Sequence, residues 1–413
     1  MVPQNGVGDW WRRMVSQNGV RNRYQRMVLQ MSGTECAEDE MANLYLYLES
    51  GVVNRGNTKR LKQCMARGAA GEKLVIGYLG GSITMGSVAT VQEKCYAYLS
   101  YLWWKESFPQ AQVEFVNAGI GATTSQFAVA RVEEDLLAYK PDVVFIEFTV
   151  NDEATEHFKE TYEGLLRKVY GHETKPAVIT LQNAFYHDGV SAEAIHTPVA
   201  KHYDLPILSF KKAVVERVMA GEITEVDITP DHLHPNDKGH ALLAEAVRYY
   251  LDRVYAEWKS GGVEAKEAHV LPVALTKNRY ETSMRLNNKN LIVSSAMNFV
   301  EDTSKQEHIT QIFKNGWEFS EEGAYLEAEL EATCLAIQYR RTMQHPAPSM
   351  RVLVDHNEVM ILNGEFDETW GDLIALSTVF ENDRKEKHQV RLELCNVHED
   401  DKLPFYLVSF LVS

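Results

Sequence analysis

The hydrophobic pattern of the chain changes once, near residue 264, and this change constrains the fold most. Before it, short continuous runs of Val, Ile, Leu and Phe alternate with helical stretches. Such runs are typical of parallel strands buried on both faces and joined by crossover helices. They predict an α/β domain with a doubly wound parallel sheet and helices on both faces. The runs are KLVIGYL (73–79), QVEFVNA (112–118), DVVFIEFTV (142–150), AVITLQ (177–182) and LPILSF (205–210).

After residue 264 the runs alternate between apolar and polar residues, and no comparable helical segment separates them. Alternation with period two is typical of strands with one buried and one solvated face. The pattern predicts an antiparallel β-sandwich or jelly roll. Its strands are expected at 325–339, 350–355, 358–362, 373–380, 390–397 and 404–413.

The first 35 residues hold a tandem duplication, in which MVPQNGVGDWWRR is followed by the imperfect copy MVSQNGVRNRYQR. This basic, aromatic stretch is either a poorly ordered or oligomer-docking arm, or a contact for an anionic surface. Helical periodicity then predicts a helical prelude. We therefore expect an arm over 1–35, a helical prelude over 36–71, the α/β domain over 72–260 and the β domain over 264–413.

The charge balance excludes some classes of protein. The 413 residues include 42 Lys and Arg against 58 Asp and Glu, so the chain lacks the basic footprint of a nucleic-acid binder. Its five scattered cysteines form no CxxC pair, which fits a reducing compartment. No apolar run is long enough for a membrane helix, and the N-terminus has no apolar signal region. We expect a soluble, cytoplasmic protein without nucleic-acid or membrane partners, and possibly a homo-oligomer through its N-terminal segments.

In open α/β sheets the ligand site lies at the carboxyl ends of the strands. A serine, backbone donors, an amide and an Asp-x-x-His pair occupy such places here, and together they are the parts of an acyl-transfer site. Taken singly, each has another explanation: a tight turn, a helix cap, or a histidine satisfied by the backbone. The residues are Ser82 after Gly80 and Gly81, then Gly121 and Ala122, then Asn151, and finally Asp231 and His234.

These motifs resemble the SGNH/GDSL hydrolases over roughly residues 72–256. The four blocks occur in the family's order, as GGSIT, NAGIGATTS, TVND and Asp231-x-x-His234-Pro235. The sequence departs from the family pattern at Gly81, where Asp is usual, at Ala122, the position of the oxyanion glycine, and at Thr149, where Gly is usual. The resemblance implies a flavodoxin-like sheet.

The resemblance also implies a role for each residue. Ser82 would be the nucleophile, His234 its general base, and Asp231 the group that orients the imidazole. The oxyanion would be met by the Ser82 N–H, the backbone N–H of Gly121 or Ala122, and the Asn151 amide.

A metal site is the alternative interpretation of the histidine-rich segment. His232, His234, Asp237 and His240 have ligand chemistry for zinc at short spacing. The Asp-x-x-His-Pro match explains His234 without an ion, so we expect no metal. No glycine-rich phosphate motif is present, so we expect no nucleotide cofactor.

The GGSIT variant and the two-domain arrangement resemble intracellular acetylesterases that deacetylate mannan oligosaccharides. The sequence has no apolar lid near Ser82, which also favours a sugar acetate over a lipid ester. We therefore expect a serine esterase that removes O-acetyl groups from plant-glycan oligosaccharides, either manno- or xylo-oligosaccharides. The expected substrate contacts are loop residues and two tryptophans of the β domain: Asp152, Glu153, His157, Asn183, Tyr186, His187, Trp317 and Trp370.

Two other functions stay open. One is an SGNH esterase or thioesterase acting on another small acyl ester, which would differ in its acyl-chain preference. The other is a non-catalytic glycan-binding protein, which would bind without turnover. The presence of Ser82, Asn151, Asp231 and His234 together argues against the second.

Overall fold

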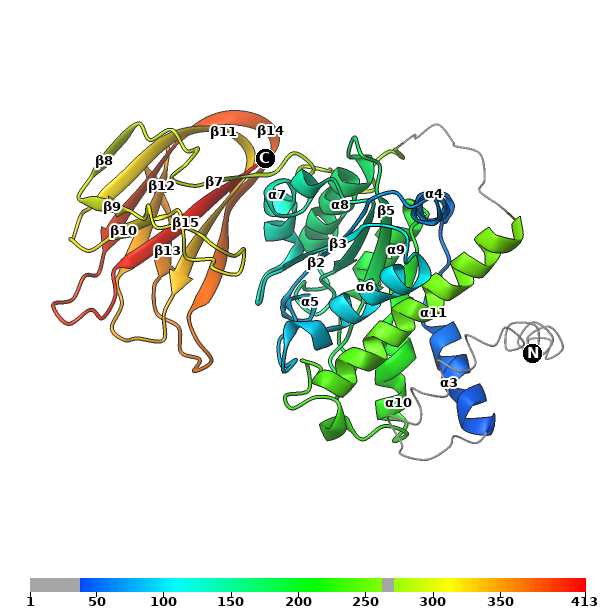
Figure 1. The fold of residues 1–413 in the computed structure, drawn as a ribbon. Helices are drawn as coiled ribbons and strands as arrows, with labels where there is room; N and C mark the ends of the chain where they lie inside the picture. The colour runs from blue at the N-terminus through cyan, green and yellow to red at the C-terminus, as the bar shows by residue number, and fades with distance from the viewer. Residues whose placement is uncertain (1–37, 262–270) are drawn as a thin grey trace.

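The computed structural model describes residues 38–261 and 271–413, and Figure 1 shows them as two domains side by side. The first is an α/β domain and the second an antiparallel β domain. The predicted N-terminal arm with its duplication lies outside the described residues, as do residues 262–270.

Within the described residues, the α/β domain is built on a six-stranded sheet of order β1-β6-β5-β4-β2-β3. The strands β2 to β6 are parallel, and the chain reverses its direction of growth between β2 and β4. The predicted doubly wound α/β fold is thus confirmed. The strands are β1 (Val52–Asn54), β2 (Leu74–Gly80), β3 (Val113–Gly119), β4 (Val143–Glu147), β5 (Ala177–Gln182) and β6 (Ile207–Ser209).

Strand β1 differs from the sequence expectation, because it lies inside the segment predicted to be a helical prelude. It pairs antiparallel with β6 at the edge of the sheet, between the helices α3 (Glu38–Ser50) and α4 (Lys59–Ala69). The described part of this segment, residues 38–71, therefore belongs to the α/β domain, because its short strand extends the sheet.

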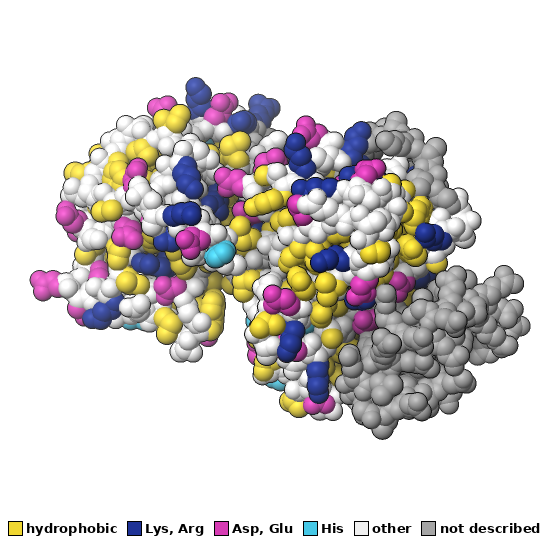
Figure 2. Space-filling model, in the orientation of Figure 1, with side chains coloured by type: hydrophobic (Ala, Val, Ile, Leu, Met, Phe, Trp, Pro, Cys, Tyr) yellow, Lys and Arg dark blue, Asp and Glu magenta, His cyan; other side chains and the backbone are white. Residues whose placement is uncertain are grey.

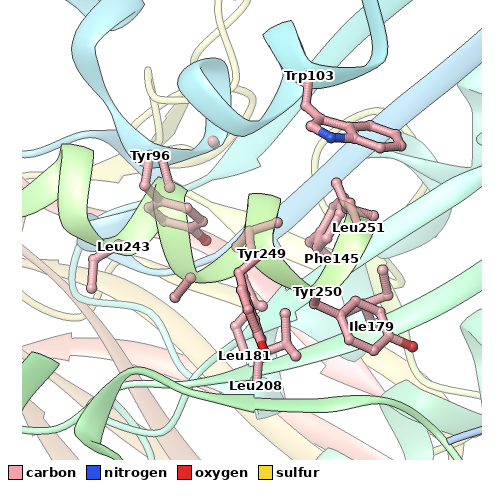
Figure 3. Packing of buried hydrophobic residues seen from close by; sticks show 14 of the residues in the cluster. Tyr96, Trp103, Phe145, Ile179, Leu181, Leu208, Leu243, Tyr249, Tyr250 and Leu251 are labelled. Carbon is pink, nitrogen blue, oxygen red and sulfur yellow. The ribbon is translucent and has the colours of Figure 1, made fainter. Parts of the chain in front are cut away.

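Helices cover both faces of this sheet. One apolar core joins Tyr78, Phe145 and Ile179 of the strands to aromatic side chains of α6 and α11, and Figure 3 shows part of this packing. The other core joins alternate strand residues such as Val144 and Ile146 to α7, α8 and α9. Burying a large apolar side chain stabilises a fold by about 1.5–3 kcal/mol, so the two-sided burial of the strands accounts for their continuous apolar runs. The longer helices are α6 (Tyr96–Ser107), α7 (Ser125–Asp135), α8 (Glu156–Gly171), α9 (Glu193–His202) and α11 (Asp237–Gly261); the short ones are α5 (Ser82–Met85), α10 (Glu216–Met219), η1 (Gln92–Lys94), η2 (Leu137–Tyr139), η3 (Lys211–Val215) and η4 (Glu225–Asp227).

The β domain is an antiparallel sheet that curls on itself, with nine strands in the described residues. Its main path runs β13-β12-β14-β11-β15-β10-β9, while β7 pairs with β15 and β8 with β11. The antiparallel β domain is confirmed; the jelly-roll connection stays a prediction. The strands are β7 (Met284–Leu286), β8 (Ser295–Met297), β9 (Phe299–Glu301), β10 (Trp317–Phe319), β11 (Tyr325–Arg341), β12 (Ser349–Val354), β13 (Asn357–Asn363), β14 (Leu373–Cys395) and β15 (Phe405–Val412).

Two long strands, β11 and β14, pair along most of their length, and the sheet curves along this pair. The register of this pair shifts after Ala332 and again after Leu335, as at a β-bulge. The run at 373–380 and residues 390–395 of the run at 390–397, expected as two strands, both belong to β14.

The two domains share an apolar contact. Ile120, in the loop after β3, and Phe127 of α7 belong to the same buried cluster as Ile374 and Leu411 of the β domain. Beside this cluster, the amide of Gln126 donates a hydrogen bond of 2.8 Å to Thr378 Oγ1. The β domain therefore packs against the carboxyl end of the sheet, where the predicted site lies.

The described cysteines, Cys64, Cys95, Cys334 and Cys395, are free and buried. In the two described ranges, no helix combines the length and the apolar character needed to cross a membrane.

Candidate active site

Ser82 lies at the turn where β2 ends and α5 begins, and its side chain is largely buried. The two preceding glycines leave room for close neighbours. A Cβ atom at Gly80 would lie 2.2 Å from Thr84 Oγ1, and one at Gly81 would lie 2.2 Å from Asn151 Oδ1. Side chains at these positions would displace the groups around Ser82, which gives a local reason for Gly at position 81, where the family pattern has Asp.

Ser82, His234 and Asp231 form a chain of hydrogen bonds. His234 Nε2 lies 2.8 Å from Ser82 Oγ, and His234 Nδ1 lies 2.7 Å from Asp231 Oδ2. Because the carboxylate accepts at Nδ1, the Nε2 atom is left to accept the Ser82 proton. The serine comes from the end of β2, while the other two residues come from the loop before α11.

The loop itself shapes Asp231. Its Oδ1 atom accepts from the backbone N–H groups of His234 and Leu233 at 2.7 and 3.1 Å. Partial burial favours the neutral acid, but these bonds and the one from the imidazole outweigh it and lower the pKa of Asp231 below its ordinary value. The carboxylate is therefore ionised at neutral pH, as a partner of a histidine base must be.

The candidate oxyanion donors lie around Ser82. A Cβ atom at Gly121 would be 3.8 Å from Ser82 Cβ, so the backbone of the loop after β3 passes beside the serine. The next residue, Ala122, has a left-handed φ of 55°. The Asn151 side-chain amide lies against Gly81, and its buried Oδ1 atom has no hydrogen-bond partner in the described part of the protein.

Thr149 fixes the start of the loop that carries Asn151 through hydrogen bonds to its neighbours. The Thr149 hydroxyl accepts from the backbone N–H of Asn183 at 2.7 Å and lies 3.0 Å from Glu147 Oε1, which also accepts from the Thr149 N–H. Burial raises the pKa of Glu147 to about 7, although the bonds from Thr149 oppose this. The Thr149 side chain, absent from the family's Gly pattern, thus connects the ends of β4 and β5.

Four of the expected substrate contacts have buried side chains in this structure. Asp152, Asn183 and Tyr186 lie in the protein interior, and Asp152 binds the protein itself through both carboxylate oxygens. Trp317 is fully buried in the core of the β domain, so its ring cannot stack on a sugar.

The other expected contacts are accessible. Glu153 is exposed, and His157 is half-buried at the domain interface, where its Nδ1 lies 3.1 Å from Glu381 Oε1. His187 is exposed beside the site. Trp370 is 60% exposed in the loop before β14.

His232, considered above only as a metal ligand, lies next to Asp231 with a φ of 64°, and its ring centroid lies 5.3 Å from that of His187. Sequence reasoning missed two buried residues that contact the Asn151 loop. Glu147 accepts from the Thr149 N–H, and His196 contacts Asp152. Neither local pattern nor motif marks these two.

The residues of the alternative metal interpretation have protein partners. His240 is buried, where its ring reaches the Tyr96 N–H and the Ser87 carbonyl, and burial lowers its pKa to about 4. Asp237 binds Lys94 and Thr90. Among the described residues, no group of three or more His, Cys, Asp or Glu side chains is arranged to hold a metal ion.

The fold and the family relationship together define a carboxylic ester hydrolase. The chain belongs to the GDSL-like lipase/acylhydrolase family, whose model matches residues 78–242. A two-domain esterase (CEX) active on acetylated mannans has a similar structure, with 47% identity, a TM-score of 0.85 and coverage of 89% of this chain and 98% of that one.

Shorter relatives match less than half of this chain. An acetylxylan esterase from Geobacillus stearothermophilus is 27% identical over 220 residues, which are 46% of this chain and 96% of the relative. Thioesterase 1/protease 1/lysophospholipase L1 from Escherichia coli strain K12 is 27% identical over 188 residues, which are 43% of this chain and 83% of the relative.

Proposed function

We propose that the protein is a serine esterase that removes O-acetyl groups from mannose- or xylose-based oligosaccharides. The observation that carries the proposal is the chain of hydrogen bonds from Ser82 through His234 to Asp231, at the point where the sheet changes direction between β2 and β4. The choice of an acetylated glycan is supported by the likeness to the mannan-active esterase, which extends over both domains.

In the proposed reaction, Ser82 Oγ attacks the acetyl carbonyl while its proton passes to His234 Nε2. The carbonyl oxygen gains negative charge, which the Asn151 amide and the backbone N–H groups of Ser82 and of Gly121 or Ala122 would stabilise. The C–O bond to the sugar then breaks, and His234 returns the proton to the departing hydroxyl. Water, deprotonated by His234, attacks the acetyl-serine, releases acetate and restores Ser82.

The β domain is proposed to complete the substrate cleft. Ile120, adjacent to Gly121, packs against Ile374, and Trp370 lies four residues before Ile374 in the chain. Figure 2 shows the surface notched between the two domains, on the side where α5 lies in Figure 1. We propose Trp370 as the aromatic contact of the sugar, with Glu153 and His187 at the rim. We also propose a cytoplasmic location, which the free cysteines of the described residues support.

The test is acetate release from acetylated manno-, xylo- and cello-oligosaccharides and from an aryl acetate, with wild-type protein and Ser82→Ala in parallel. We expect wild-type release from manno- or xylo-oligosaccharides and none with the variant. Release only from longer acyl esters would favour the esterase or thioesterase alternative. Glycan binding without turnover would favour the binding protein.

A further inference from the structure

Asp152 is a carboxylate fully buried directly after Asn151. Its two oxygens have different partners. Oδ1 accepts from the backbone N–H of Ser125 at 2.9 Å, and Oδ2 lies 3.0 Å from His196 Nε2. Burying a carboxylate is costly unless its oxygens are satisfied, so both bonds matter to where this side chain can lie.

The first partner belongs to the other donor loop. Ser125 is the first residue of α7 and follows Ala122 by three positions. The Ser125 hydroxyl also lies 2.7 Å from Thr161 Oγ1 of α8. Asp152 therefore ties the loop that carries Asn151 to the loop that carries Gly121 and Ala122.

The second partner cannot move easily. The His196 ring is fully buried on α9 and stacks on Tyr162, with 3.6 Å between ring centroids and an angle of 4° between their planes. Because the carboxylate accepts, His196 Nε2 carries a proton, which fixes the second oxygen of Asp152.

We propose that Asp152 and His196 are positioning residues, which clamp together the two loops that supply the oxyanion donors. The inference rests on the proposed function. An oxyanion hole works only when its donors lie about 2.7–3.1 Å from the developing charge. A displacement of about 1 Å can cost on the order of 100-fold in rate, so a clamp between the donor loops would act on kcat.

The principal variant is Asp152→Ala, which removes both bonds. With an aryl acetate we expect kcat to fall about 30- to 100-fold and KM to stay within about twofold. Asp152→Asn keeps an oxygen for the Ser125 N–H and should recover at least about tenfold of the loss. His196→Phe keeps a flat ring on Tyr162, removes the Nε2 donor and tests the same clamp if Asp152→Ala does not fold; we expect it to lower kcat about 5- to 10-fold.

Two measurements distinguish a positioning role in catalysis from a role in stability alone. Ser100→Ala, a control, removes a buried hydroxyl of α6 that donates to the Ala97 carbonyl and should lower the melting temperature without lowering kcat. In an Asn151→Ala background, Asp152→Ala should lose less activity than in the wild type, because part of its effect acts through the missing amide.

A folded Asp152→Ala or His196→Phe protein with unchanged kcat would overturn the inference, as would equal losses from Asp152→Ala in both backgrounds. Either result, with wild-type turnover intact, leaves the proposed function standing. A wild-type protein that hydrolyses no ester would instead overturn the proposed function, and the clamp with it.

Discussion

The imidazole of His234 lies 2.8 Å from the hydroxyl of Ser82, although 152 positions separate them in the chain. The doubly wound sheet brings them together, because the end of β2 and the loop before α11 meet at the same edge.

Asp231→Asn is expected to lower kcat by about 10³-fold or more. The amide of Asn would donate to His234 Nδ1, and Nε2 would then carry the proton and could not accept that of Ser82. The measurement is steady-state hydrolysis of an aryl acetate. Asp188→Asn, which alters an exposed carboxylate beside His187, is the matched control. A kcat within about threefold of wild type for Asp231→Asn would remove this residue from the mechanism.

Asn151→Ala is expected to lower kcat about 100- to 1,000-fold and to leave KM nearly unchanged. The amide would act on the charge of the transition state, which the ground-state ester lacks. Steady-state kinetics separate the two parameters. An increase in KM at constant kcat would instead assign Asn151 to ground-state binding.

Glu147 should make stability depend on pH. Burial raises its pKa in the folded protein to about 7, against 4.5 for an ordinary Glu. Its contribution to stability is therefore greatest below about 4.5 and is progressively lost as the pH rises to about 7. Glu147→Gln cannot titrate, so the melting temperature of wild type relative to this variant should fall between pH 5 and 7.5. A constant or rising difference would contradict the prediction.

Trp370→Ala is expected to raise KM for acetylated oligosaccharides about 3- to 10-fold and to leave aryl acetate hydrolysis unchanged. Among the aromatic pairs of the described residues, its exposed ring pairs only with that of Phe366, at 5.0 Å between ring centroids and an angle of 81°. Trp317→Phe is the control, because it changes a buried ring and should affect melting rather than KM. Equal KM for oligosaccharides in wild type and Trp370→Ala would exclude the sugar contact.

Chelation of divalent metal ions should leave esterase activity unchanged, since His240 and Asp237 are engaged by protein groups. Activity on an aryl acetate before and after EDTA treatment checks this. Loss of activity that zinc restores would revive the metal interpretation.

Ser82, Gly121 and Asn151 were predictable because they closely follow strands whose apolar runs are plain in the sequence, and Asp231 and His234 because of the Asp-x-x-His-Pro motif. Asp152 was not, because its burial depends on His196, which lies 44 residues away on a helix without a motif. The sequence pattern also did not predict that β14 is one continuous strand. Its middle, residues 381–389, is polar and falls between the two predicted strands, yet Glu381 and residues 386–389 are paired with β11 on an exposed part of the sheet.

Ile120 links the contact between the two domains to the candidate active site. Its side chain lies in the apolar contact with Ile374 and Leu411, while its chain neighbour Gly121 lies beside Ser82. Recombination that replaced the β domain with an unrelated module would expose Ile120 to water and loosen the loop next to the serine. The two halves are therefore expected to be inherited together, and substrate range to change through substitutions at the interface rather than through exchange of modules.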